Sequence, residues 1–127
     1  MALIHPPPDI VYHWPDAAAL DLAAMELAYN PFADELTVAF GGTGRPAIIH
    51  PLDWTPADYV ALRLDPETDE VVGIQLDHAQ RVAAAEHPAW SAVIDAAASK
   101  AGVHAPAKSA WPALARLISD VKALARF

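Results

Sequence analysis

Apolar and polar residues alternate along three short stretches in the middle of the chain. These are residues 35–40 (ELTVAF), 58–64 (DYVALRL) and 71–77 (VVGIQLD). A period of two sends successive side chains to opposite faces of a β-strand. Each predicted strand therefore has one apolar face, as in an antiparallel sheet that is covered on one side.

The residues between these stretches predict two β-hairpins. Residues 31–34 (PFAD) separate a strand at 25–30 from the strand at 35–40, and residues 65–69 (DPETD) join the other two. Proline presets the φ angle of a turn, and Asn and Asp side chains bond to nearby backbone amides. Both connections therefore have the chemistry of tight turns.

The segments around the hairpins follow from shorter patterns. Residues 1–15, with three consecutive prolines, predict an extended arm. Residues 17–24 fit either a short helix capped by Asp16 or the lead-in to a strand. Residues 47–50, which follow a glycine-rich loop at 41–46, fit a fifth strand.

Two helices are predicted at the C-terminal end, where apolar residues recur every three or four positions. Pro88 suits a first helical turn, Gly102 a helix end, and Ser109 the cap of the last helix. Residues 103–108 would form the loop between the helices. The apolar stripes are Trp90, Val93, Ile94, Ala97 and Ala101 in one helix, and Trp111, Leu114, Leu117, Ile118, Val121 and Leu124 in the other.

These elements predict one α+β domain spanning residues 1–127, a usual length for a single domain. An extended arm (1–15) would precede a β-hairpin core (25–80) and a C-terminal pair of α-helices (87–127). We expect a small antiparallel sheet of four or five strands with the helices on one face. A homodimer is also expected, because small sheets expose edges that need covering and two apolar helix stripes can exceed what one sheet buries.

Charge is unevenly distributed along the chain, whose net charge is −8. Residues 25–80 hold ten acidic residues against two arginines, whereas residues 81–127 hold six basic residues against three acidic ones. The acidic middle fits either solvated faces or a surface for a small basic protein. Nucleic acid is disfavoured as a ligand, because phosphate binding needs clustered lysine and arginine.

The absence of cysteine limits the possible chemistry, and the absence of long apolar runs bears on compartment. The chain has no cysteine, which excludes disulfides, thiolate zinc sites and thiol catalysis. No apolar run approaches the ~18 residues of a membrane span, and the N-terminus lacks the pattern of a signal peptide. We therefore expect a cytoplasmic protein, and the alanine-rich, lysine-poor composition is typical of bacteria with GC-rich genomes.

Two segments resemble motifs of the bacterial family catalogued as domain of unknown function 2283. Members read approximately Y-D-x-x-x-D-x-L-Y-I, followed later by an acidic turn and V-V-G-I-E-I-L-D-A. Residues 29–38 (YNPFADELTV) and 65–79 (DPETDEVVGIQLDHA) are similar to these motifs, so the resemblance covers about residues 25–80. Asn30 stands where the family prefers Asp, Gln75 where it prefers Glu, and the segment between the motifs is longer here.

The resemblance implies a small antiparallel sheet with no established activity. Some relatives are encoded beside small toxin-like proteins, which implies an antitoxin-like, neutralising role. The motifs of the family also imply three fold determinants in this chain. Tyr29 would be a half-buried strand residue, Asp34 a turn former, and Gly73 a glycine that lets another backbone approach.

No motif in the sequence indicates a catalytic residue, a cofactor site or a metal site. The six histidines lack metal-ligand spacing, no serine lies in a G-x-S-x-G setting, and the glycine-rich loop precedes no helix with a lysine. The carboxylates of residues 65–70 fall in a predicted turn, whereas a catalytic pair must flank a cleft.

Aromatic residues are the remaining candidates for a binding site. A pocket or interface between sheet and helices would be lined by Trp54, Tyr59, Trp90 and Trp111, with His78 or His50 as its polar group. Anchoring of the core is the alternative role for the tryptophans.

These observations favour a non-catalytic interaction module, such as an antitoxin-like neutralising partner of a small basic protein. The alternative is a small-molecule-binding protein or weak enzyme with its pocket between sheet and helices.

Overall fold

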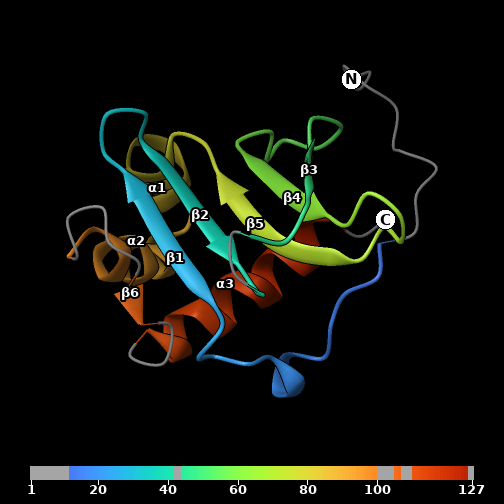
Figure 1. The fold of residues 1–127 in the computed structure, drawn as a ribbon. Helices are drawn as coiled ribbons and strands as arrows, with labels where there is room; N and C mark the ends of the chain where they lie inside the picture. Colours follow the sequence, from blue (N-terminus) through green and yellow to red (C-terminus); the bar gives the residue numbers. More distant parts are fainter. Residues whose placement is uncertain (1–11, 42–43, 100–104, 107–109, 126–127) are drawn as a thin grey trace.

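A computed structural model describes residues 12–41, 44–99, 105–106 and 110–125 (Figure 1). The fold is α+β, as the sequence predicts, with the helices mostly in the C-terminal part. The strands are β1 (Glu26–Asn30), β2 (Glu35–Ala39), β3 (Ile48–Pro51), β4 (Val60–Leu64), β5 (Val71–Leu76) and β6 (Ala105–Pro106). The helical segments are η1 (Ala17–Ala19), η2 (Ala79–Ala83), α1 (Ala84–Glu86), η3 (Pro88–Trp90), α2 (Ser91–Ala98) and α3 (Trp111–Leu124).

The strands form one antiparallel sheet in the order β3-β4-β5-β2-β1-β6. The two predicted hairpins are β1–β2 and β4–β5, and the predicted fifth strand is β3. The hairpins join through β2 and β5, where Leu36 lies beside Leu76 and Val38 beside Ile74. Strands distant in sequence thus share one apolar face.

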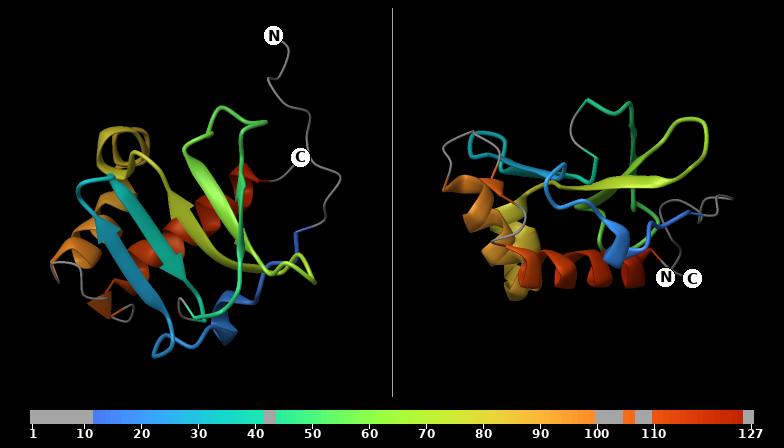
Figure 2. Two further views of the ribbon diagram at one scale, coloured as in Figure 1. Left: turned by 45° about the horizontal axis from the view of Figure 1, so that its top comes forward. Right: turned by 60° about the horizontal axis from the view of Figure 1, so that its bottom comes forward.

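Helices α2 and α3 lie on the same side of the sheet (Figure 2). Helix α2 packs against β1, and α3 runs beneath the sheet with its predicted apolar stripe turned inward. The stripe residues Leu114, Leu117, Ile118 and Val121 are buried, while Trp111 is half-buried at the first position of α3. The core therefore fills the single layer between sheet and helices.

Gly73 in β5 lies where a side chain has no room. A Cβ atom there would overlap the carbonyl oxygen of Val38 and would lie 2.8 Å from Cδ of Arg63. This is the close approach of another backbone that a glycine inside a strand predicts. Arg63 extends over Gly73 on the sheet face opposite the helices.

Several predicted elements differ in the structure. Residues 17–24 contain one 3-10 turn, η1, because the Asp16 and Asp21 side chains accept hydrogen bonds from the Ala18 and Ala23 amides and close two short turns. No helix was predicted between the strand at 71–77 and residue 87, but η2 and α1 lie there. Such short helical segments lack the repeated stripe that makes a helix recognisable in sequence.

The C-terminal region differs at two further points. The loop predicted at 103–108 contains β6, whose Ala105 and Pro106 pair with Leu27 and Glu26 at the edge of the sheet. The N-cap position of α3 is Ala110, which makes no side-chain cap bond. The predicted cap Ser109, the helix end Gly102 and Ala101 lie outside the described residues, as do residues 1–11 of the arm.

In the part of the chain that the structure describes, no helix has the length and apolarity needed to cross a membrane.

Candidate functional site

Asp34 is the one buried charged side chain among the described residues, and it joins the first hairpin to the segment after β5. Its Oδ1 accepts hydrogen bonds from the Tyr29 hydroxyl at 2.7 Å and the Gln80 amide at 2.8 Å. Its Oδ2 accepts one from the Arg81 amide at 3.1 Å, and its backbone carbonyl accepts one from the Ala79 amide at 2.8 Å. Asp34 thereby satisfies the amides that begin η2.

These contacts shift the pKa values of both side chains. Burial by itself raises the pKa of Asp34, but the bonds from the Gln80 amide, the Tyr29 hydroxyl and the Arg81 amide outweigh it, so the pKa lies below its usual range. Partial burial and the neighbouring Asp34 carboxylate raise the pKa of Tyr29 to about 12. Asp34 therefore stays ionised at neutral pH as a structural acceptor.

Tyr59 and Trp90, two of the predicted pocket residues, meet through His87. The His87 and Trp90 rings stack with centroids 3.9 Å apart, and the Tyr59 ring lies 6.4 Å from His87. The Tyr59 hydroxyl donates to Glu86 at 2.7 Å, and the Trp90 indole N–H donates to Asp120 at 2.9 Å. Burial and Glu86 raise the pKa of the Tyr59 hydroxyl. Both tyrosine and tryptophan are buried, so this cluster ties β4 to the helices.

The other predicted pocket residues take separate positions. Trp54 is buried beside Tyr12, whose ring packs edge-on against His50 at 5.7 Å. His78 is exposed at the end of β5, with a positive φ of 51° that turns the chain into η2. The tryptophans Trp54 and Trp90 are thus core anchors, the alternative that the sequence left open.

A hollow of about 660 Å³ lies at the first hairpin, where no pocket was predicted. Its walls come from β1, β2, the turn between them and the end of α2, and Phe32 at the turn is fully exposed. The lining residues are Ala28, Tyr29, Asn30, Pro31, Phe32, Glu35, Thr37 and Ala98. The site depends on the packing of α2 against β1, which no local pattern indicates.

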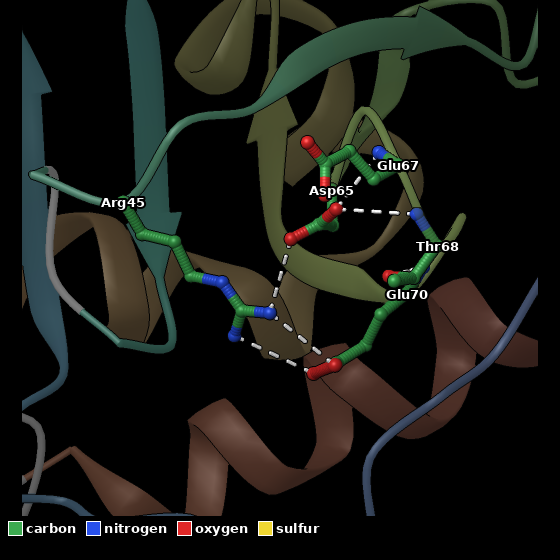
Figure 3. Close-up of polar contacts among 5 residues, drawn as sticks. All are labelled: Arg45, Asp65, Glu67, Thr68 and Glu70. Atoms are coloured by element: carbon green, nitrogen blue, oxygen red, sulfur yellow. Dashed lines mark hydrogen bonds and ion pairs between the residues drawn. The ribbon is translucent and has the colours of Figure 1, made fainter.

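Arg45 joins the glycine-rich loop to the β4–β5 turn (Figure 3). Its guanidinium contacts Asp65 at 3.3 Å and Glu70 at 3.3 Å, while Oδ1 of Asp65 also accepts bonds from the Glu67 and Thr68 amides. The Glu67 amide and Arg45 lower the pKa of Asp65. Two acidic residues of this turn are therefore occupied by an internal cation.

At the opposite end of the sheet, four acidic residues lie at or near the ends of four adjacent strands. Glu35 opens β2, Asp77 follows β5, Asp58 precedes β4 and Asp53 follows β3. The register places these strand ends side by side, since Leu36 pairs with Leu76, Leu76 with Val60, and Ala61 with Pro51. We call these four residues the acidic end.

The described residues contain no group of three or more His, Cys, Asp or Glu side chains that could hold a metal ion. No protein-family model matches the chain, and no curated protein or solved structure gives a significant match.

Proposed function

We propose that this protein is a non-catalytic interaction module whose acidic end binds a small basic protein. The supporting observation is that the strand order gathers Glu35, Asp53, Asp58 and Asp77 at one end of the sheet. Complementary charge accelerates encounter and selects partners more than it adds raw affinity. A chain of net charge −8 suits a cationic partner on this account.

The ion pairs and hydrogen bonds of the individual carboxylates favour the acidic end over the β4–β5 turn as the surface for a basic partner. In the turn, Asp65 and Glu70 already pair with Arg45. At the acidic end, Asp58 is exposed, and the Asp77 carboxylate accepts a hydrogen bond from the neutral Gln75 side-chain amide at 3.2 Å. The nearby Arg81 pairs with the buried Asp34 at 3.6 Å. Among the described residues, Asp58 and Asp77 are thus less neutralised by cations than Asp65 and Glu70.

The resemblance to domain of unknown function 2283 supports a particular kind of basic partner. An antitoxin-like role would make the basic partner a small toxin-like protein, neutralised in the cytoplasm. The same proposal includes a homodimer. Of the two reasons for it, the exposed edge strand β3 remains, whereas most described residues of the helix stripes are buried within one chain and Trp111 and Leu124 are half-buried.

The test is affinity capture from the source cells with three versions of the tagged protein. A triple variant (E35Q, D58N, D77N) removes charge at the acidic end. A control variant (E67Q, D69N) removes charge from the turn at the other end, and asparagine tolerates the positive φ of 59° at Asp69. Wild type and control should recover a small basic protein in stoichiometric amounts.

The triple variant should bind the recovered protein about tenfold more weakly or worse, since each of the three charges contributes about 0.5 kcal/mol. Equal binding by both variants would contradict the acidic end as the site. Turnover of common ester, phosphate or glycoside substrates by the purified protein would contradict the non-catalytic reading.

The hollow at the first hairpin supports a second candidate, a small-molecule-binding protein. Its volume of about 660 Å³ lies within the usual range for ligand sites, roughly 300–1,000 Å³. Its lining is mainly apolar, with Tyr29, Asn30, Glu35 and Thr37 as polar groups. A fragment screen by protein NMR tests it, and shifts confined to the hairpin and Ala98 are the expected result. A screen without hits there would remove this candidate.

A further inference from the structure

Strand β3 forms one edge of the sheet and contains no Asp, Glu, Lys or Arg (Figure 1). Among the described residues, the most exposed large hydrophobic side chains are Phe32, Ile48 and Ile49, and two of these three lie on β3. An edge strand presents unpaired backbone groups, and proteins usually protect such edges with charge or cover them. This edge has no charged side chain to protect it.

The hydrogen bonds of the sheet show which groups of β3 point outward. The Leu52 amide donates to the Val60 carbonyl at 2.9 Å, immediately beyond the paired residues Pro51 and Ala61. Bonded and non-bonded pairs alternate in an antiparallel ladder, so Ile48 and His50 bond to β4. The N–H and C=O of Ile49 therefore point away from the sheet.

Pro51 has the same outward orientation but no N–H to donate. This is the position in an edge strand that tolerates proline. It also limits how far a second strand can pair, and leaves Ile49 as the centre of the available edge.

We infer that two copies of this chain join through β3, antiparallel about Ile49, into one continuous sheet. At the centre, each Ile49 N–H would donate to the Ile49 carbonyl of the second copy. Ile48 of each copy would lie beside His50 of the other. The inference rests on the homodimer proposed above and names its surface; it does not involve the acidic end.

Charge favours a second copy as the occupant. Two chains of net charge −8 repel one another, and residues 48–51 (IIHP), which contain no Asp, Glu, Lys or Arg, add nothing to that repulsion. The arrangement is also self-complementary, because an Ile49 pair matches identical groups across a two-fold axis. Tyr12 of the chain's own arm packs its ring edge-on against His50 of β3, but the three consecutive prolines before it have no N–H to donate to this edge.

The pairing brings no like charges into contact. Arg63 lies opposite Ile49 on β4, so the two copies of Arg63 would be three strand spacings apart, about 14 Å. That separation exceeds the screening length of about 8 Å at physiological salt. Because only a four-residue strand pairs, we expect a weak, concentration-dependent dimer.

Sedimentation of the full chain between about 10 and 500 µM tests the inference. The wild-type mass should rise toward twice 13.5 kDa. Ile49→Lys should stay monomeric, because a charged edge opposes pairing. Ile49→Pro should stay monomeric too, because it deletes the central outward N–H and leaves the bonds to β4 in place. Phe32→Lys, an equally drastic change at an exposed site outside β3, should associate like wild type.

The possible failures are distinct. If the wild type and both Ile49 variants all dimerise, β3 is not the dimer surface, although the homodimer itself is supported. Wild type that is monomeric throughout would overturn both, and protection of its Ile49 amide from hydrogen exchange would show that the chain's own arm covers the edge. Circular dichroism of each variant at the lowest concentration should match wild type.

Discussion

The Asp34 carboxylate accepts a 2.8 Å hydrogen bond from the amide of Gln80, a residue 46 positions later in the chain. A turn residue of the first hairpin thus holds the start of the helical segment that follows the second. The bond fixes one hairpin relative to the other at the side of the sheet where the acidic end begins.

Loss of the Asp34 carboxylate should destabilise the protein strongly. Asp34→Ala leaves two amides and the Tyr29 hydroxyl without their acceptor, and we expect a loss of about 2 kcal/mol in the free energy of unfolding. Asp34→Asn should lose less, since it retains one oxygen and tolerates the positive φ of 52°. Urea unfolding monitored by circular dichroism measures both, and equal loss would contradict the role of the oxygens.

The stabilisation of the fold by the Asp34 carboxylate should be lost at acid pH. Its pKa in the folded state is lowered, so its stabilisation is present above the ordinary value of 3.8 and is lost as pH falls through the folded pKa. The stability difference between wild type and Asp34→Asn should therefore be constant from pH 7 to 5 and shrink below about pH 4. A difference that grows in acid would contradict the assigned direction.

The stabilisation of the fold by the Tyr29 hydroxyl should instead be lost at alkaline pH. Its pKa is raised from 10.0 to about 12, so its contribution is complete below pH 10 and is lost as pH rises through 12. Wild type should lose more stability than Tyr29→Phe between these values, while the difference between the two proteins stays constant below pH 9. Urea midpoints at pH 8 to 11.5 measure this; parallel curves throughout would refute it.

Gly73 should tolerate no side chain. Gly73→Ala places a methyl group against the Val38 carbonyl and Cδ of Arg63, and such overpacking costs about 3 kcal/mol when a backbone atom cannot move. Gly44→Ala is the matched control, because a Cβ there meets no atom within 4 Å. Thermal unfolding should show a large loss for the first variant and nearly wild-type behaviour for the second.

The Trp90 indole depends on Asp120 for its acceptor. Asp120→Ala leaves the N–H of a fully buried tryptophan unpaired, which should cost about 1–3 kcal/mol. Asp120→Asn keeps an acceptor and should cost less, and Asp95→Ala, at an exposed position of α2, should change little. Chemical unfolding of the three variants checks the order; a loss at Asp95 as large as at Asp120 would contradict it.

Local sequence patterns predicted the structure correctly wherever interactions between residues close together in the chain determine it. Alternating residues predict β2, β4 and β5, and the spacing of Leu114, Leu117 and Val121 predicts the buried face of α3. The turn at residues 31–34 follows from Asn30, whose Oδ1 accepts the Phe32 amide at 3.0 Å. Periodicity and turn chemistry act over a few residues, so a single sequence carries them in full.

The strand order, by contrast, was decided only in the tertiary structure. Pairing of β2 with β5 depends on which apolar faces can be buried together, a choice made among distant segments. That choice brings Asp34 to Gln80, His87 to Trp90, and the acidic end together from four strands. It also separates Trp54 from the predicted pocket and leaves Ile49 at an edge. The sequence by itself determined the strands and helices, because the interactions that form them are local. Packing decided which strands and helices lie next to one another.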